Sequence, residues 1–317
     1  MDHRITYGME IEFYLREVPY DIPRLLIEHG FHRDYADTYE VSTKPYDLDN
    51  YKEFRREYLE LKKQIERIGG YLCAEYSNTE RTWTNGSHIH IRIEPVRPVI
   101  WARALNWLTI LAALLAPAQC NCVRIYDLGD KIIASDYCGE KIYAFRYRVQ
   151  HFATPPKRVN WLLMSELLRT KRFRSLYPYA ESNDFYGVEI NAYRKDVHTI
   201  EIRTNENGWK VAVMFADLVN MLKDINSPPI DPVMLWNTYV RGGPTRIDRQ
   251  IVVFLKNHPL TSYLPKALGG GTIVAPDIFA NALLQFAEDR KYDLLPPTKE
   301  LLKILASGRR IKFSETI

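Results

Sequence analysis

Three short segments of the sequence carry ionisable side chains at alternate positions, the spacing that places side chains on one face of a β-strand. The polar residues are Glu10 and Glu12 in Gly8–Phe13, His88 and His90 in Asn85–Ile91, and Glu201 and Arg203 in Thr199–Arg203. The residues between these polar positions are apolar. If the three strands are neighbours in one sheet, the charged groups project into one cleft and the apolar side chains pack behind it. This composition indicates a site for metal ions and phosphate.

Paired carboxylates at positions i and i+2 of a strand point the same way, so they can hold one cation or two adjacent cations. Carboxylate-rich ligand sets favour magnesium or manganese, and a histidine among them is compatible with manganese. Such a cluster beside an arginine suits phosphoryl transfer, in which metal ions and a guanidinium stabilise phosphate charge. Either Glu-x-Glu or His-x-His alone is usually a solvated strand face. The prediction therefore depends on the combination.

The bulk composition is that of an ordinary globular protein. The 317 residues are enough for one large domain, or a large domain with a smaller attachment. The 43 basic and 39 acidic residues leave a charge of +4, an excess too small to indicate nucleic acid as a partner. Four cysteines do not make a disulfide framework. The first strand begins too early for a signal peptide to precede it, so we expect a cytoplasmic location.

The elements that must position these residues follow from periodicity and from turn signals. We expect helices over Pro19–Gly30, Lys52–Ile68, Trp101–Ala116, Asn160–Leu168 and Trp209–Ile225, and further strands over Asp37–Pro45, Tyr71–Tyr76 and Gly187–Tyr193. We expect a β-hairpin in which Gly187–Tyr193 pairs with Thr199–Arg203. The apolar run Trp101–Ala116 contains Arg103 and is shorter than the roughly 20 residues of a spanning helix. We therefore expect a buried core helix there and no membrane span.

The double proline Pro228-Pro229 is the best internal boundary. It divides the chain into a first domain, 1–226, and an extension, 227–317, that we expect to pack on this domain. Within the extension we expect helices over Pro232–Lys256, Ala275–Asp289 and Thr298–Ala306. The glycine run Gly269–Gly271 would form a mobile loop between them. We expect no polar strand comparable to the first three in this extension.

In their order along the chain, these motifs resemble those of the glutamine synthetase and glutamate–cysteine ligase superfamily, most closely its amidoligases. Gly8–Phe13 is similar to the first metal-binding strand, Asn85–His90 to the glycine-rich segment before His-x-His, and Gly187–Tyr193 with His198–Arg203 to the amidoligase hairpin. The resemblance covers about Tyr7 to Asn226, so 1–226 would be the carboxylate–amine ligase catalytic domain. It implies an α+β fold, in which a curved antiparallel sheet has a polar, metal-binding face and helices on the other face. The mostly helical C-terminal extension would be added to this fold.

The resemblance also implies roles for particular residues. Glu10, His88 and Glu201 would bind the metal that bridges the ATP phosphates, and Glu12 would serve a second metal with Glu40, which stands in a segment similar to the Glu-x-Ser/Thr-x-Pro of glutamate–cysteine ligases. Ser87 and His90 would face the nucleotide, and Arg203 and Glu40 would be catalytic, Arg203 against the transferred phosphoryl group or the substrate carboxylate. Thr199 stands where glutamine synthetase has an arginine, so phosphate contacts would come from Arg194, Arg146 or Arg148. Glu75 is either a further ligand or a structural carboxylate.

The activity implied is that of a ligase dependent on ATP and Mg²⁺ or Mn²⁺. ATP would convert a substrate carboxylate to an acyl phosphate, and an amine would displace phosphate to give an amide. The carboxylate and the amine could belong to an amino acid, a peptide or a protein side chain, and the oligomeric state stays open. Gly269–Gly271 or the loop around Asp130 could close the cleft. Two alternatives stay open: a metal-dependent phosphoesterase or nuclease that uses the same cluster, and a non-catalytic relative that binds a nucleotide or a macromolecular partner.

Overall fold

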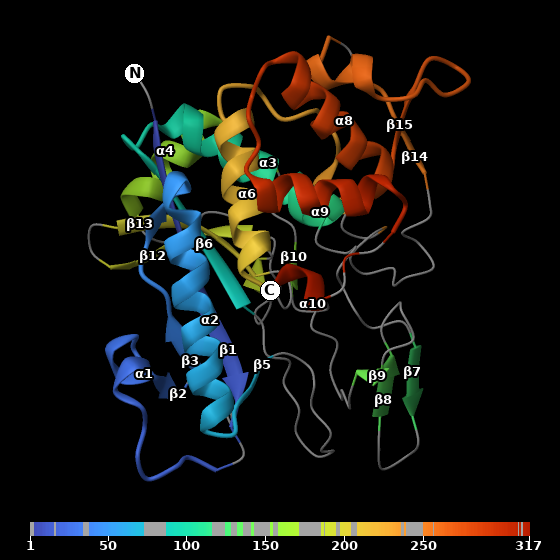
Figure 1. The fold of residues 1–317 in the computed structure, drawn as a ribbon. Helices are drawn as coiled ribbons and strands as arrows, with labels where there is room; N and C mark the ends of the chain where they lie inside the picture. Colours follow the sequence, from blue (N-terminus) through green and yellow to red (C-terminus); the bar gives the residue numbers. More distant parts are fainter. Residues whose placement is uncertain are drawn as a thin grey trace.

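The computed structural model describes residues 3–15, 17–33, 38–72, 87–115, 124–127, 132–135, 141–142, 153–154, 158–170, 185–186, 188–194, 197–203, 208–235, 238, 250–255, 257–309, 311 and 313–317. These residues form an α+β fold around one large antiparallel sheet (Figure 1). The predicted α+β class and antiparallel sheet are confirmed.

The main sheet joins strands from both ends of the predicted first domain. Its spatial order is β12 (Val188–Arg194), β13 (Val197–Ile202), β6 (Ser87–Glu94), β1 (Arg4–Tyr14), β3 (Thr38–Ser42) and β2 (His32–Arg33). The short strands β4 (Tyr46–Asp47) and β5 (Tyr71–Leu72) also pair with β1. The predicted hairpin is confirmed, since Val188 of β12 lies opposite Ile202 of β13.

The register of this sheet decides which side chains share a face, because directly opposite residues in an antiparallel pair lie on the same side. Glu10 is opposite His88, Glu12 is opposite Glu40, and Glu201 is opposite His90. Along β6 the residues alternate between buried and half-buried, beginning with buried Ser87. All three polar strands therefore present their ionisable residues on one face of the sheet.

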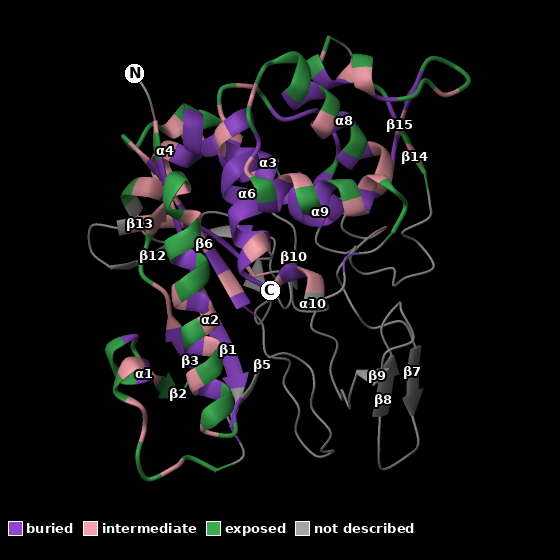
Figure 2. Ribbon diagram, in the orientation of Figure 1, coloured by how far each residue is buried: buried purple, intermediate pink, exposed green. Residues whose placement is uncertain are grey.

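Helices cover the opposite, apolar face (Figure 1). The helix α2 (Tyr51–Arg67) confirms the helix predicted over Lys52–Ile68, and it buries Phe54, Tyr58, Leu61 and Ile65. The helix α6 (Trp209–Leu222) packs on β1 and on α2. The helix α1 (Arg24–Glu28) is shorter than the predicted range Pro19–Gly30. In Figure 2 α2 carries both buried and exposed residues along its length, as expected for an amphipathic helix between core and solvent.

The apolar helix α3 (Pro98–Leu115) lies in the core. Its Trp101 donates to the Ile93 carbonyl oxygen and its Trp107 to the Ile225 carbonyl oxygen, at 3.0 and 2.8 Å. Among the described residues it is the one helix long and apolar enough to cross a membrane, and 78% of that stretch is buried inside the protein. The prediction of a buried core helix is therefore confirmed. The neighbouring helix α4 (Trp161–Thr170) corresponds to the predicted helix Asn160–Leu168.

The C-terminal residues differ in part from the prediction. The helices α8 (Pro276–Asp289) and α9 (Pro296–Ala306) are confirmed, and α9 packs on α6. The predicted helix Pro232–Lys256 is wrong, since α7 covers only Pro232–Leu235 and Ile251–Val253 forms the strand β14, paired with β15 (Thr272–Val274). The β-branched run Ile251-Val252-Val253 favours an extended backbone, which explains the difference.

The remaining elements are short. They are the 3₁₀ turns η1 (Leu48–Asn50) and η6 (Pro259–Tyr263), the helix α10 (Phe313–Thr316), the three-stranded sheet β7 (Arg124–Asp127), β8 (Ile132–Ser135) and β9 (Lys141–Ile142), and the parallel pair β10 (Ala153–Thr154) and β11 (Phe185–Tyr186). Gly269 and Gly270 adopt positive φ angles of 85° and 84° in a hydrogen-bonded turn before β15. That Gly269–Gly271 closes the cleft stays a prediction. The other candidate for closing it, the loop around Asp130, lies outside the described residues.

Candidate functional site

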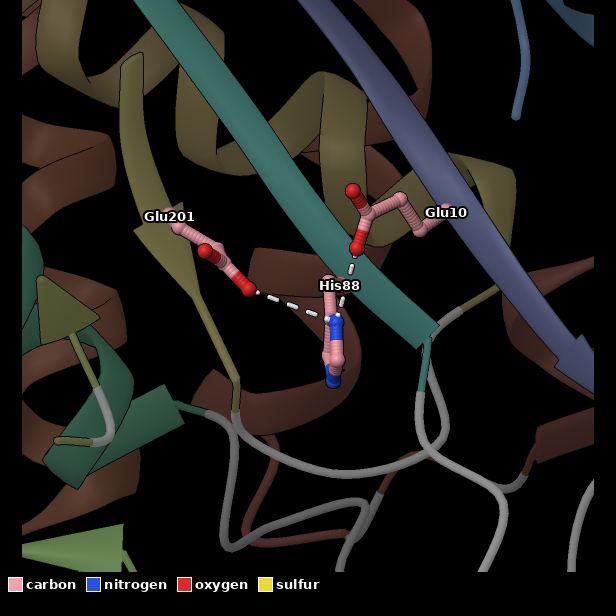
Figure 3. A group of neighbouring side chains, drawn as sticks. All are labelled: Glu10, His88 and Glu201. Atoms are coloured by element: carbon pink, nitrogen blue, oxygen red, sulfur yellow. Dashed lines mark hydrogen bonds and ion pairs between the residues drawn. The ribbon is translucent and has the colours of Figure 1, made fainter. Parts of the chain in front are cut away.

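Glu10, His88 and Glu201 converge from three neighbouring strands (Figure 3). The Nδ1 atom of His88 lies 2.9 Å from Glu10 Oε2 and 3.3 Å from Glu201 Oε1. Each residue offers a ligand atom within 4.8 Å of the other two, as ligands of a single metal ion would. We call this set the first ligand group. The sequence-based condition that these three residues lie close enough to share an ion is met.

Glu12, Glu40 and His88 form a second ligand group, which contains residues of β1, β3 and β6. The Nε2 atom of His88 is 3.2 Å from Glu12 Oε1, so the two nitrogens of this imidazole face different groups. Glu40 lies opposite Glu12 in the register of β1 and β3. Five residues expected at metals are thus brought together in two adjacent groups that share His88.

His90 and Arg203 border the first ligand group. The Nε2 atom of His90 lies 3.1 Å from Glu10 Oε1, and its Nδ1 atom lies 2.9 Å from the Thr199 hydroxyl. A guanidinium nitrogen of Arg203 lies 2.7 Å from Glu201 Oε1, and the Glu201 side chain is 0% exposed. Glu10 and Thr199 therefore orient the His90 ring, and Glu201 orients the Arg203 guanidinium.

Burial and charge act in opposite directions on the pKa values of the histidines. Burial lowers the pKa of His88, but Glu12 and the hydrogen bond with Glu10 raise it to about 9. The pKa of His90 is also raised, because contacts with Glu10 and Glu201 outweigh its burial. Burial raises the pKa of Glu10, but hydrogen bonds from His88 and His90 outweigh this effect and hold that pKa far below its usual range. Without a cation, the histidines thus act as the counter-charges of the carboxylates.

Glu40 behaves differently from Glu10. Burial, followed by the charges of Glu10 and Glu12, raises the pKa of Glu40 to about 7, although His88 and His32 oppose this rise. The pKa of Glu40 therefore lies near neutral pH. A raised pKa of this kind is common where several carboxylates share a site.

The donor set fits a divalent cation. The two ligand groups contain four carboxylates, those of Glu10, Glu12, Glu40 and Glu201. The guanidinium of Arg203 contacts one of them, Glu201. Oxygen ligands with one imidazole are the preference of Mg²⁺ and Mn²⁺. A bound cation would replace the counter-charge that protonated His88 and His90 supply to these carboxylates in its absence.

Other predicted site residues are not brought to these groups. Ser87 is buried and lies opposite Ile11, so it belongs to the apolar face rather than to the face of His88. The period-2 alternation that places His88 on the polar face excludes Ser87 from it. The backbone of Arg194 ends β12, and its side chain lies outside the described part of the structure. Arg146, Arg148 and Glu75 lie outside the described residues.

The structure also places side chains near the site that the sequence patterns did not indicate. His32 of β2 lies opposite Glu40, with its Nε2 atom 3.9 Å from Glu40 Oε1. A strand of two residues shows no alternation, so no periodic signal marked His32. His29 binds the Glu57 carboxylate at 2.9 Å, and its carbonyl oxygen accepts from the Ser42 backbone at 2.8 Å. These contacts anchor β3, and hence Glu40, to the helical layer.

Comparison with known proteins finds no match to a protein-family model or to a curated protein. Chains of solved structures do match, among them the following two. One is the complex between Prokaryotic Ubiquitin-like Protein Pup and its ligase PafA, with 11% sequence identity, a TM-score of 0.45, and coverage of 98% of this chain and 66% of that chain. The other is a novel glutamine synthase homolog, with 14% identity, a TM-score of 0.39, and coverage of 96% and 66%. This chain thus spans just under two thirds of each.

Proposed function

We propose that this protein is an ATP-dependent carboxylate–amine ligase that uses divalent cations. The observation that carries the proposal is the meeting of four carboxylates and His88 in two adjacent ligand groups on one sheet face. Arg203 lies beside the first group. Enzymes that transfer phosphoryl groups commonly use two cations and a guanidinium to stabilise the phosphate charge. The order of the motifs along the chain supports the ligase over other phosphoryl-transfer enzymes.

The two ligand groups have separate roles in this proposal. Glu10, His88 and Glu201 would hold the cation that bridges the ATP phosphates, and Glu12 with Glu40 would hold the second. Bound Mg²⁺ or Mn²⁺ would supply charge stabilisation for the transferred phosphoryl group. The 2.7 Å contact with Glu201 holds the Arg203 guanidinium beside the first group, where it can contact the phosphoryl group or the substrate carboxylate. His90, fixed by Glu10 and Thr199, would face the nucleotide.

The proposed reaction has two steps. A substrate carboxylate oxygen attacks the γ-phosphorus of ATP and the bond to ADP breaks, which gives an acyl phosphate. An amine nitrogen then attacks the acyl carbon, phosphate leaves, and the amine loses a proton as the amide forms. Because Glu40 would be an ionised ligand of the second cation at this stage, that proton would leave to solvent.

All residues of both ligand groups lie within 1–226, which supports this range as the catalytic domain. The substrates would be a carboxylate and an amine from amino acids, peptides or protein side chains. A cytoplasmic location is part of the proposal, because such a ligase requires ATP.

The test measures ADP formation by the full chain with ATP, Mg²⁺ or Mn²⁺, and mixtures of carboxylates and amines. Hydroxylamine, a strong small amine, would trap an acyl phosphate as a hydroxamate without knowledge of the natural amine. We expect ADP formation to require both substrates, and Glu201→Gln to lower it by about 100-fold or more, the size of effect that follows from removing a group that stabilises transition-state charge. Glu60→Gln, on the exposed face of α2, is the matched control and should leave the rate unchanged.

The outcomes separate the proposal from its alternatives. A phosphoesterase or nuclease would cleave a phosphate ester such as bis(p-nitrophenyl) phosphate with no need for an amine. A non-catalytic relative would bind ATP with no turnover, and its binding would survive Glu10→Ala and Glu201→Ala. Either result, in place of ADP and hydroxamate formed together, would rule out the ligase.

A further inference from the structure

Thr199 lies on the polar face beside the first ligand group. It precedes Glu201 by two residues on β13, so both side chains point to the same face of the sheet. The Thr199 hydroxyl lies 2.9 Å from the Nδ1 atom of His90, the residue that is directly opposite Glu201 on β6. Thr199 itself belongs to neither ligand group. Its recorded contact with the site therefore passes through His90.

His90 connects this hydroxyl to a residue of the first ligand group. Its Nε2 atom lies 3.1 Å from Glu10 Oε1, and both side chains are largely buried. An ionised carboxylate can only accept a hydrogen bond, so the Nε2 atom carries a proton and donates it to Glu10. Thr199, His90 and Glu10 thus form a chain of polar contacts across the three neighbouring strands β13, β6 and β1.

The two oxygens of Glu10 have different partners. Oε1 faces His90, whereas Oε2 lies 2.9 Å from the Nδ1 atom of His88, which is also in the first ligand group. A cation between Glu10 and His88 would take Oε2, and Oε1 would keep its contact with His90. A histidine outside the ligand set commonly orients a ligating carboxylate in this way, and such outer contacts affect metal affinity.

The hydroxyl of Thr199 suits the Nδ1 atom of His90 in either protonation state of the ring. In the neutral ring with a proton on Nε2, Nδ1 has the lone pair and accepts from the hydroxyl. In the protonated ring, Nδ1 donates to the hydroxyl oxygen instead. The ring is held with Nε2 toward Glu10 in both cases. Both nitrogens of His90 are then engaged, so its effect on the first ligand group passes through Glu10.

We propose that Thr199 is a positioning residue for the first cation: through His90 it holds the Glu10 carboxylate in the orientation that binds the ion. The inference rests on the proposed function, because that function places a cation in the first ligand group. The second group should not depend on Thr199. Its Glu40 lies on β3, and its Glu12 faces the other nitrogen of His88 at 3.2 Å.

The first test measures Mn²⁺ binding by the full chain in a Glu12→Gln background, which weakens the second group. Free Mn²⁺ would be followed by electron paramagnetic resonance without nucleotide. We expect Thr199→Val to weaken binding of the remaining ion roughly tenfold or more, and Thr199→Ser, which keeps the hydroxyl, to retain it. Equal Mn²⁺ affinities with and without Thr199→Val would overturn the inference.

Thr6→Val is the matched control for this test. Thr6 lies on the same face of β1, four residues before Glu10 and opposite Arg92, so the change deletes a hydroxyl from the polar face away from the ligand groups. We expect it to leave Mn²⁺ binding unchanged. A loss of affinity as large as that of Thr199→Val would mean that any such deletion disturbs the sheet, and the inference would fail.

The second test separates positioning of Glu10 from a general loss of structure. In a Glu10→Gln background, which weakens the first group instead, Thr199→Val should leave the affinity for the remaining Mn²⁺ unchanged. An equal loss in the Glu10→Gln and Glu12→Gln backgrounds would overturn the inference. It would also be overturned if Thr199→Val lowered the affinity for ATP and left that for Mn²⁺ unchanged, because Thr199 and His90 would then serve the nucleotide directly.

The two proposals can fail separately. If Thr199→Val weakens the first Mn²⁺ but ATP is never consumed, the ligase proposal fails and this inference stands. If ATP-dependent ligation occurs and Thr199→Val leaves Mn²⁺ binding unchanged, only this inference fails. If the full chain binds no Mn²⁺, both fail.

Discussion

Two regions of this molecule bury carboxylates, and they do so in different ways. Asp217 lies on α6 in the helical layer and is 1% exposed, and Glu201 lies on the polar face of the sheet and its side chain is 0% exposed. Burial of a carboxylate without compensation costs several kcal/mol, so each region must compensate for it. The way in which each does so distinguishes a structural contact from a candidate binding site.

Asp217 is compensated by donors from its own chain. The Leu295 backbone donates to its Oδ2 atom at 2.8 Å, and the Tyr292 hydroxyl donates to its Oδ1 atom at 2.9 Å. Burial still raises its pKa, although these hydrogen bonds oppose the rise. Both carboxylate oxygens are therefore bound, and the contacts fasten the segment before α9 to α6.

The ligand groups of the sheet show the opposite balance. Hydrogen bonds from His88 and His90 hold the pKa of Glu10 far below its usual range, whereas burial and the charges of Glu10 and Glu12 raise the pKa of Glu40 to about 7. Such a set gains stability when a cation is added from outside, whereas Asp217 already has its donors. A buried carboxylate matched by its own chain is thus structural, and a group with surplus carboxylates retains the capacity to bind.

Asp217→Asn should have the largest effect on folding. An amide places N–H donors against the Leu295 N–H or the Tyr292 O–H, so we expect the free energy of unfolding to fall by about 3 kcal/mol, the cost of leaving buried groups unsatisfied. Urea unfolding would measure it. Glu12→Gln is the matched change in the ligand groups. Without metal it relieves repulsion with Glu40 but removes a charge that favours protonated His88, and because these effects oppose each other it should cost less than about 1 kcal/mol. Equal losses in both variants would break the comparison.

The pH dependence of stability should show the surplus of carboxylates. The pKa of Glu40 is raised from 4.5 to about 7 by folding, so the folded state binds more protons than the unfolded state within this window. The metal-free free energy of unfolding should therefore fall as pH rises from 4.5 to 7, by about 3 kcal/mol at most. Unfolding in a chelator at several pH values would measure it, and Glu40→Gln should flatten the profile. A stability that rises in the wild type and is unaffected by Glu40→Gln would contradict this account.

Cation binding should release protons from the site. The pKa of His88 is about 9 in the metal-free protein, because Glu12 and Glu10 outweigh the effect of burial. The imidazole must lose a proton to ligate, so Mn²⁺ should displace about one proton at pH 7.5. Calorimetry in two buffers of different ionisation enthalpy would measure the release. His88→Asn should abolish it and Glu60→Gln should not. Release that is independent of His88 would exclude it as the ligand.

Tyr292→Phe should have the smallest effect. It removes one donor from Asp217 and the acceptor of the Asn220 amide, each at 2.9 Å. We expect a loss of about 1 kcal/mol in the free energy of unfolding, the usual net value of one hydrogen bond. Tyr263→Phe is the control, because the hydrogen bond from the Tyr263 hydroxyl to Asp289 is exposed to solvent. A loss of 3 kcal/mol in Tyr292→Phe would mean that the tyrosine, rather than the carboxylate, is the main element of this contact.

Much of this fold could be predicted from spacing alone. The alternation in Gly8–Phe13 and the helical periodicity in Lys52–Ile68 each belong to one segment, so no distant contact is needed to recognise them. The same reasoning assigned Glu10, Glu12, His88 and Glu201 to a polar face. Ser87 shows the limit of motif similarity, because the alternation itself places it on the apolar face.

The arrangement between segments was decided by the tertiary structure. The order of strands brings Glu40 against Glu12 and His32 against Glu40, and it divides the two nitrogens of His88 between two carboxylate groups. Asp217 gave no signal in an apolar helix, since its donors come from residues more than 70 positions away. The sequence alone determined which side chains share a strand face, because alternation is local. Which faces meet depends on long-range packing, and this packing decided how the charges of the site are balanced.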